Sequence, residues 1–261
     1  MYFEVSNNEN SSIICNVPHA GTAIPEEFRK SFVLTQEELD TEAEYMADKH
    51  TDVLYSELLY VSSFIMSKIS RIVVDIERFQ NEEDEPMAKV GMSAFYTRTS
   101  SGMALRNISQ EMKNILERIY NDYHDSFADT VDLVLKKNNL ALIVDCHSFP
   151  SVPRIYESDQ KSERPDICIG TDEYHTPQKM TYLLKKNLED VGYSVKINTP
   201  FSGSIVPTRY YQKDRRVLSI MVEVNRTLYM NEENFKKLKN ISEVGRTVSR
   251  CIIKSLNQFL E

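Results

Sequence analysis

The sequence predicts an α/β fold in which a mixed, mostly parallel sheet is flanked by helices. Apolar stretches of strand length, at 12–17, 140–144 and 218–222, alternate with longer stretches of helical periodicity. A run of five apolar residues such as Leu140–Val144 is typical of a strand buried on both faces. Strands that alternate with helices favour a sheet covered on both sides. We expect a single domain over residues 1–261, because a chain of this length need not be split.

The positions of the helices follow from capping residues and periodicity. Pro25 and the acids after it open one helix, and Thr35 with Glu38 forms a capping box at the start of a helix that should run to about Leu59. The longest helix is predicted from Ile108 to 136–139. We further expect short apolar runs at 64–69 and 72–76, strands at 166–170 and 193–197, helices at 177–191 and from about Asn231, and long loops at 80–106 and 199–211.

Composition excludes several classes of function. A net charge of −8 without a basic, aromatic-rich stripe argues against a nucleic-acid surface. No stretch approaches the roughly 18 to 20 apolar residues of a membrane span, and the polar start at 1–10 is not a signal peptide. The cysteines lack C-x-x-C spacing, which favours buried, reduced thiols. We expect a cytoplasmic protein that acts on a small molecule, without nucleic-acid or membrane partners. The cysteines are Cys15, Cys146, Cys168 and Cys251.

Polar side chains follow the three buried strands at their carboxyl ends, where α/β sheets place their ligands. The first strand runs into His19, the second into His147 and the third into Glu223. Zinc hydrolases usually hold the metal with three N or O ligands and leave a fourth position for water. The pattern therefore predicts a metallohydrolase with His19 and His147 as ligands. A structural loop histidine is the alternative for either one taken alone.

The remaining roles are less specific. Thr22 stands where a His-x-x-Glu motif would place a ligand, so the third ligand falls to Asp48 or Asp52, which share one helix face at i and i+4. Glu223 would be partly desolvated and suited to act as a general base. Its alternative role is an ion pair with Arg78 or Arg226.

Two further residue types bear on function. Arginine holds carboxylates bidentately, so Arg78, Arg209 and Arg226 near strand ends and in loops favour an acidic substrate. Cys146 stands beside His147, but neighbours in an extended segment point to opposite faces and cannot share one pocket. A cysteine hydrolase is therefore a weak alternative.

Together these residues form motifs that resemble the N-formylglutamate amidohydrolase family. The resemblance extends from about His19 to Met230 and follows the family's order. One departure is Glu77, where the family pattern has asparagine before the arginine. The motifs are Val17–Pro25, Ala47–Tyr55, Ser70–Arg78, Asp145–Ser148, Asp166–Gly170, Pro200–Gly203 with Thr208–Tyr211, and Val222–Arg226 to Tyr229–Met230.

The resemblance implies a fold similar to the zinc hydrolases of the carboxypeptidase A and aspartoacylase group. By it, His19, His147 and an aspartate, with Asp48 favoured over Asp52, hold one Zn²⁺. Glu223 is the implied general base and acid, while Arg78 and Arg209 grip the substrate's carboxylates. The implied reaction is hydrolysis of an N-acyl acidic amino acid, foremost N-formyl-L-glutamate to formate and L-glutamate. Alternatives are another small N-acyl amino acid or short peptide at the same site, or a non-catalytic relative that binds a metal or an acidic ligand.

Overall fold

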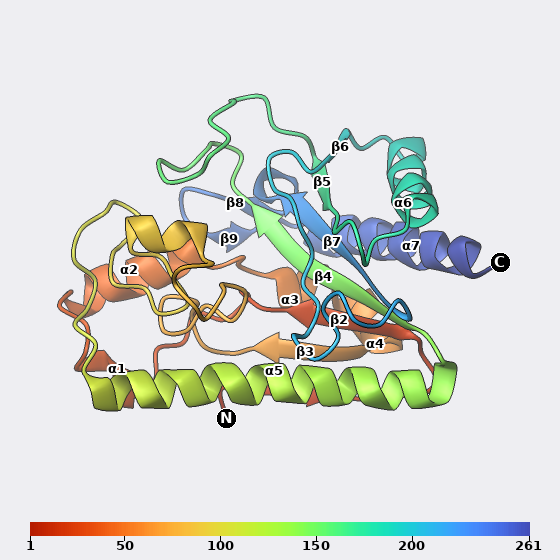
Figure 1. Ribbon diagram of the computed structural model, residues 1–261. Helices are drawn as coiled ribbons and strands as arrows, with labels where there is room; N and C mark the ends of the chain where they lie inside the picture. Colours follow the sequence, from red (N-terminus) through yellow and green to blue (C-terminus); the bar gives the residue numbers. More distant parts are fainter.

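One sheet runs through the computed structural model, which describes residues 1–261 (Figure 1). Its seven strands lie in the order β1-β3-β2-β4-β7-β5-β6. The central strands β3, β2, β4 and β7 are parallel, β1 is antiparallel to β3, and β5 is antiparallel to β7 but parallel to β6. The predicted mixed, mostly parallel sheet is confirmed. The strands are β1 Phe3–Ser6, β2 Ile13–Val17, β3 Ser63–Ser67, β4 Ala141–Phe149, β5 Ile167–Gly170, β6 Val195–Ile197 and β7 Val217–Asn225.

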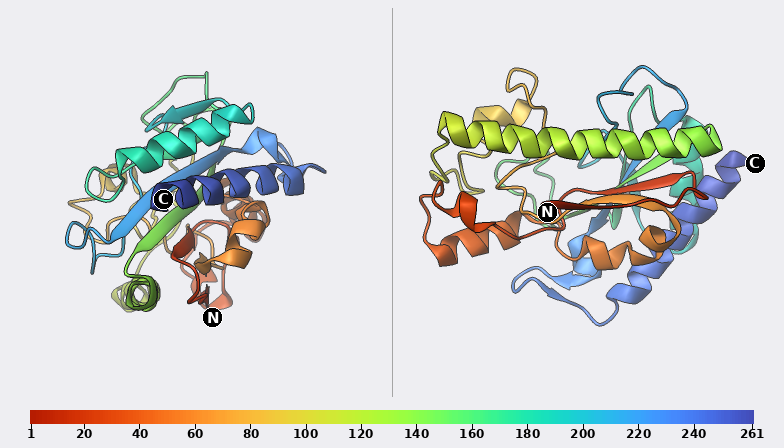
Figure 2. Two further views of the ribbon diagram at one scale, coloured as in Figure 1. Left: turned by 90° about the vertical axis from the view of Figure 1, so that its right-hand side faces the viewer. Right: turned by 90° about the horizontal axis from the view of Figure 1, so that it is seen from below.

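Helices cover both faces of the sheet (Figures 1 and 2). Alternate strand residues feed two separate cores: Ile14 and Ile143 pack with α5, whereas Ile13 and Leu142 pack with α7 and its neighbours. This alternation follows from the two-residue period of a strand. No helix has both the length and the apolar character needed to cross a bilayer. The helices are α1 Glu26–Arg29, α2 Gln36–Met46, α3 Thr51–Leu54, α4 Ser56–Val61, α5 Gln110–Asn138, α6 Gln178–Asp190 and α7 Ile241–Leu260, with short 3-10 turns at Pro86–Val90 and Arg226–Leu228.

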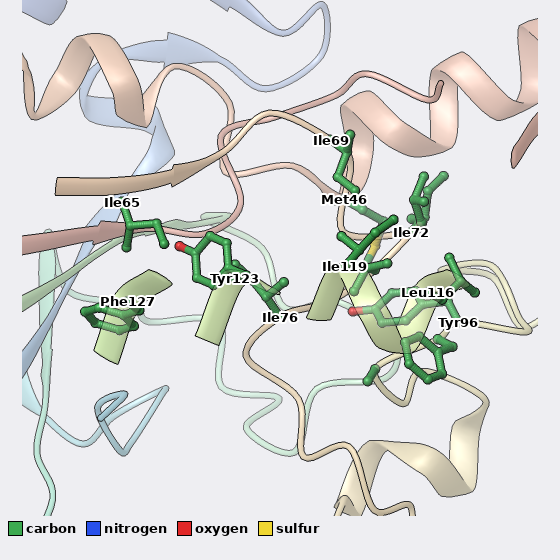
Figure 3. Close-up of a cluster of buried hydrophobic side chains, with 14 of the residues drawn as sticks. Met46, Ile65, Ile69, Ile72, Ile76, Tyr96, Leu116, Ile119, Tyr123 and Phe127 are labelled. Carbon is green, nitrogen blue, oxygen red and sulfur yellow. The ribbon is translucent and has the colours of Figure 1, made fainter. Parts of the chain in front are cut away.

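The long helix α5 forms the floor under the part of the sheet that carries the polar residues. Figure 3 shows its side chains, among them Ile119 and Phe127, facing Ile65 of β3 and the neighbouring turn. Tyr123 lies in the same row, and its hydroxyl donates a 2.6 Å hydrogen bond to the side-chain oxygen of Asn16 on β2. Apolar packing and the Tyr123 hydrogen bond thus hold α5 against the part of the sheet that carries the polar residues.

The helix expected to run to about Leu59 is interrupted, so that prediction was wrong. α2 ends at Met46, Ala47 is extended with ψ 148°, and His50 is left-handed with φ 69° before the chain resumes as α3 and α4. The Asp48 N–H donates to the carbonyl of His19 at 2.9 Å. This long-range bond takes the place of a helical one and is invisible to local periodicity.

One other segment differs from the predictions. The last helix begins at Ile241 and not near Asn231, because Met230–Asn231 (β8) and Lys236–Lys237 (β9) form a small hairpin. The Asn231 side chain accepts from the backbone N–H groups of the hairpin turn, which favours a turn over a helix start. The apolar run at 72–76, for which no type of element was predicted, is a buried turn.

The contact between α7 and α3 depends on a glycine. A Cβ added at Gly245 would lie 2.2 Å from the carbonyl oxygen of Leu54, so the two helices would have to separate. We expect Gly245→Ala to lower the free energy of unfolding by about 1–3 kcal/mol, as overpacking does. The exposed Arg250→Ala on the same helix should change it by less than about 0.5 kcal/mol. Equal denaturation midpoints for the two variants would contradict this packing.

Candidate functional site

The parallel strands bring polar side chains to one face of the sheet. On β4, Asp145 and His147 continue the row of Ile143, which faces α5, and in the register His147 lies beside Glu223 of β7. Asn16 of β2 pairs with Asp145 and faces the same way. The predicted convergence of strand-end residues is therefore a direct consequence of register and strand period.

His19 lies in the turn after β2 and is held through one ring nitrogen. Its Nε2 lies 2.9 Å from Oδ1 of Asp75, whose other oxygen accepts from Arg71 at 2.7 and 3.0 Å and from the Tyr96 hydroxyl at 2.8 Å. The Asp75 carboxylate is fully buried and has little freedom to move. The other nitrogen of His19, Nδ1, is buried and has no hydrogen-bond partner.

His147 is held in the same manner by a different carboxylate. Its Nδ1 lies 2.9 Å from Oδ2 of Asp48, and Oδ1 of Asp48 accepts from Arg226 at 2.9 Å. The break between α2 and α3 is what places Asp48 here. The Nε2 of His147 is buried and forms no well-aligned hydrogen bond, although Oε2 of Glu77 and Oδ1 of Asp145 each lie 3.0 Å from it.

Glu77 faces both free nitrogens. Its Oε2 lies 3.0 Å from His147 Nε2 and 3.8 Å from His19 Nδ1, while its Oε1 accepts from the Asn16 amide at 2.9 Å. The three ligand atoms of His19, Glu77 and His147 lie within 4.8 Å of one another. Buried polar atoms are rarely left without a partner, and an N, N, O set suits zinc and related ions. These three residues can therefore hold a metal ion.

The surrounding charges favour a cation at this point. Burial alone would lower the pKa of His147, but the carboxylates of Glu77 and Asp145 raise that pKa well above its ordinary value. Burial and the charge of Asp145 raise the pKa of Glu77. Because metal ligands must be deprotonated, metal binding at this point would be linked to the release of protons.

Glu223 has the properties of a proton-transfer group. It is buried beside His147, and its Oε2 has no hydrogen-bond partner. Burial raises the pKa of Glu223 to about 8, with Asp48 acting in the same direction and His147 and Arg226 opposing it. Cys146, by contrast, lies in the apolar core on the other face of the sheet, and burial raises its thiol pKa well above the usual value. A thiolate nucleophile is disfavoured there.

Of the other predicted site residues, one lies at the edge of the cluster and two lie away from it. Asp52 is exposed on α3, away from the buried position of Asp48. Arg78 borders the cluster, with Nε 3.6 Å from Asp75 and a side chain 27% exposed. Arg209 instead pairs with Asp129 and Asp132 on the solvent side of α5. The structure thus brings together His19, Asp48, His147 and Glu223, with Arg78 at the edge and Arg209 on the outer surface.

Sequence reasoning missed the roles of Asp75 and Glu77. The signal was present, because the apolar run 72–76 ends in Asp75-Ile76-Glu77-Arg78, as the three recognised strands end in polar residues. That run is a turn, however, so the direction of its side chains does not follow from strand alternation.

Comparison with known proteins shows the family to which this chain belongs. A family model described as N-formylglutamate amidohydrolase matches residues 11–230. The chain belongs to this family. It is 24% identical to an N-formylglutamate deformylase of Pseudomonas putida, over 94% of this chain and 91% of the relative, and 26% identical to one of Pseudomonas aeruginosa, over 94% and 92%. The resemblance inferred from the motifs is thereby confirmed.

Solved structures share the fold of this amidohydrolase. A crystal structure of N-formylglutamate amidohydrolase from Ralstonia eutropha JMP134 superposes with a TM-score of 0.84 at 18% identity, covering 98% of each chain. The gene product Atu2144 from Agrobacterium tumefaciens gives 0.72 at 16% identity, covering 100% of this chain and 96% of that one. The architecture thus persists at low sequence identity.

The ionised Asp75 should stabilise the fold in a pH-dependent way. Burial opposes its ionisation, but Arg71 and His19 hold its pKa well below the ordinary value. The resulting stabilisation is fully present above the unfolded-state pKa of about 3.9 and is lost as the pH falls toward the lower folded-state pKa. We expect Asp75→Asn to lower the free energy of unfolding by about 3–5 kcal/mol at pH 7, because Arg71 is left buried without its partner.

The difference in the free energy of unfolding between wild type and Asp75→Asn should become smaller as the pH falls from 5 to 3. Urea denaturation at each pH measures this difference. The exposed Asp52→Asn serves as the matched control and should show little difference at either pH. A gap for Asp75→Asn that stays constant or widens in acid would contradict the assigned ion pair.

Proposed function

We propose that this protein is a zinc-dependent amidohydrolase that converts N-formyl-L-glutamate to formate and L-glutamate. One observation carries the proposal: two buried histidine nitrogens without well-aligned hydrogen bonds face Glu77, and Glu223, whose Oε2 is unpaired, lies beside His147 in the strand register. Membership of the amidohydrolase family and two relatives named N-formylglutamate deformylase support the reaction and the substrate.

Three atoms would hold the metal: Nδ1 of His19, Nε2 of His147 and Oε2 of Glu77. Bound zinc supplies a Lewis acid toward the amide carbonyl and toward water. Asp75 and Asp48 then act as orienting groups that fix the tautomer of each histidine. Asp48, the ligand favoured by the sequence, is the alternative third ligand. If Asp48 held the metal, His147 would bind that metal through Nδ1, the nitrogen that faces Asp48.

Glu223 would move the proton. Its unpaired Oε2 accepts a proton from the attacking water and then delivers it to the amide nitrogen as the C–N bond breaks, so that one proton is transferred and the carboxylate is regenerated. The pKa raised by burial makes Glu223 a stronger base than an exposed glutamate. The neighbouring strand position beside His147 keeps this group next to the reacting carbonyl.

Arg78 would bind the α-carboxylate of the substrate. Its contacts with Asp75 at 3.6 Å and Glu85 at 3.7 Å are long, so its N–H groups remain available. Arg209, the second predicted carboxylate ligand, is paired with α5. It would take part only if the 199–211 segment exchanged those ion pairs for the substrate.

The reaction is tested by formate release from N-formyl-L-glutamate. We expect turnover by zinc-loaded protein, loss of turnover after chelation, and recovery when zinc is restored. Glu223→Gln should lower kcat by at least about 100-fold with little change in zinc binding, since it removes the proton-transfer group alone. Turnover that survives chelation would contradict metal dependence. Activity only on other N-acyl amino acids or short peptides would overturn the substrate.

Zinc affinity distinguishes the two candidate third ligands. We expect Glu77→Gln to weaken zinc binding by more than about 100-fold and Asp48→Asn by about 10- to 100-fold, the effect of losing an orienting partner. Competition with a chromophoric chelator measures both, with Asp52→Asn as the matched exposed control. A larger loss for Asp48→Asn than for Glu77→Gln would assign the ligand role to Asp48.

A further inference from the structure

The loop between β4 and β5 lies beside the site and carries two polar groups that the proposed reaction has not used. It leaves the carboxyl end of β4, two residues beyond His147 (Figure 1). The Arg154 guanidinium stacks on Tyr45, with Cζ 3.5 Å from the ring centroid. The Tyr156 hydroxyl lies 3.4 Å from the sulfur of Met46. Tyr45 and Met46 end α2 just before Asp48, so the loop is fastened next to the break that builds the site.

Neither group has a strong partner. Arg154 has no carboxylate within 4.0 Å, whereas Arg71, Arg78 and Arg226 at the site each lie beside one. The only acceptor of the Tyr156 hydroxyl is a thioether, which is a weak one. Both side chains are partly exposed, so a ligand can reach them.

The Tyr156 hydroxyl lies in the field of three guanidinium groups and one carboxylate, that of Glu157. Burial raises the pKa of Tyr156 to about 12, and the guanidinium groups of Arg71, Arg154 and Arg226 act against that rise. Arg71 and Arg226 are already bonded to Asp75 and Asp48. Of these three guanidinium groups, Arg154 is therefore the one without a carboxylate partner. Its stack on Tyr45 occupies the face of the guanidinium and leaves the in-plane N–H groups open for bidentate contact.

We propose that Arg154, assisted by the Tyr156 hydroxyl, binds the side-chain carboxylate of the acidic substrate. This inference rests on the proposed function. The α-carboxylate is attached to the carbon that bears the scissile amide nitrogen, so it must stay close to the metal ligands, where Arg78 borders the cluster. The side-chain carboxylate lies further along the substrate and reaches outward to the loop. Arg154 thus sets the preference for an acidic over a neutral side chain.

The test compares N-formyl-L-glutamate with N-formyl-L-glutamine, which differ only in that carboxylate. We expect Arg154→Ala to lower kcat/KM for the glutamate substrate by about 10- to 100-fold and for the glutamine substrate by less than about 3-fold. Tyr156→Phe should act in the same direction by about 2- to 10-fold. Arg154→Lys should retain part of the preference, because it keeps the charge but loses the bidentate geometry.

A matched control is available in Arg215, whose guanidinium stacks on Tyr174 at 4.1 Å. It precedes β7, whereas the site lies at that strand's carboxyl end. Arg215→Ala should leave both substrates unchanged. Equal losses for the two substrates in Arg154→Ala, or no loss for either, would overturn the inference.

Calorimetry with L-glutamate and L-glutamine separates this inference from the proposed reaction, since binding requires no turnover. Absence of turnover by wild type would contradict the proposed function. The role of Arg154 would then be decided by the binding measurements alone. Glutamate binding that Arg154→Ala weakens at least about 10-fold, with glutamine binding unaffected, would support the role of Arg154. Glutamate binding that is unchanged in the variant, or absent in wild type, would overturn it.

Discussion

Each of two buried histidines is bound through one ring nitrogen by a carboxylate and turns its other nitrogen toward Glu77. The rest of the site depends on this constraint. Asp75 and Asp48 orient His19 and His147, and Arg71 and Arg226 in turn compensate the buried carboxylates. With both rings fixed, their free nitrogens and Glu77 face a common point. Catalytic geometry of this kind requires support behind the ligands as much as the ligands themselves.

The fold supplies that support by two different means. Register and the two-residue strand period place Asp145, His147 and Glu223 on the face toward α5, where they need no special local conformation. Asp48 and Asp75 come instead from irregular backbone, one in the break after α2 and the other in a buried turn. The sheet therefore provides the ligands' common face, and the interruptions provide the groups that orient them.

This division explains what could be predicted from the sequence. His19, His147 and Glu223 were recognisable because a buried strand is a local pattern and polar residues at its carboxyl end have a defined place in the sheet. Glu77 could not be placed, because its turn has no period. The end of α2 could not be placed, because the bond from Asp48 to the His19 carbonyl joins residues far apart in the chain. The pairing of Arg209 with α5 likewise depends on tertiary contacts.

The most direct test of the central claim is nitrogen-15 NMR of the histidine rings in zinc-loaded protein. We expect the chemical shifts to identify Nδ1 of His19 and Nε2 of His147 as the metal-bound nitrogens, with the opposite nitrogen of each ring protonated against Asp75 and Asp48. Metal bound through Nδ1 of His147 would contradict this account, because that nitrogen would no longer be held by Asp48 and the carboxylate completing the site would not be Glu77.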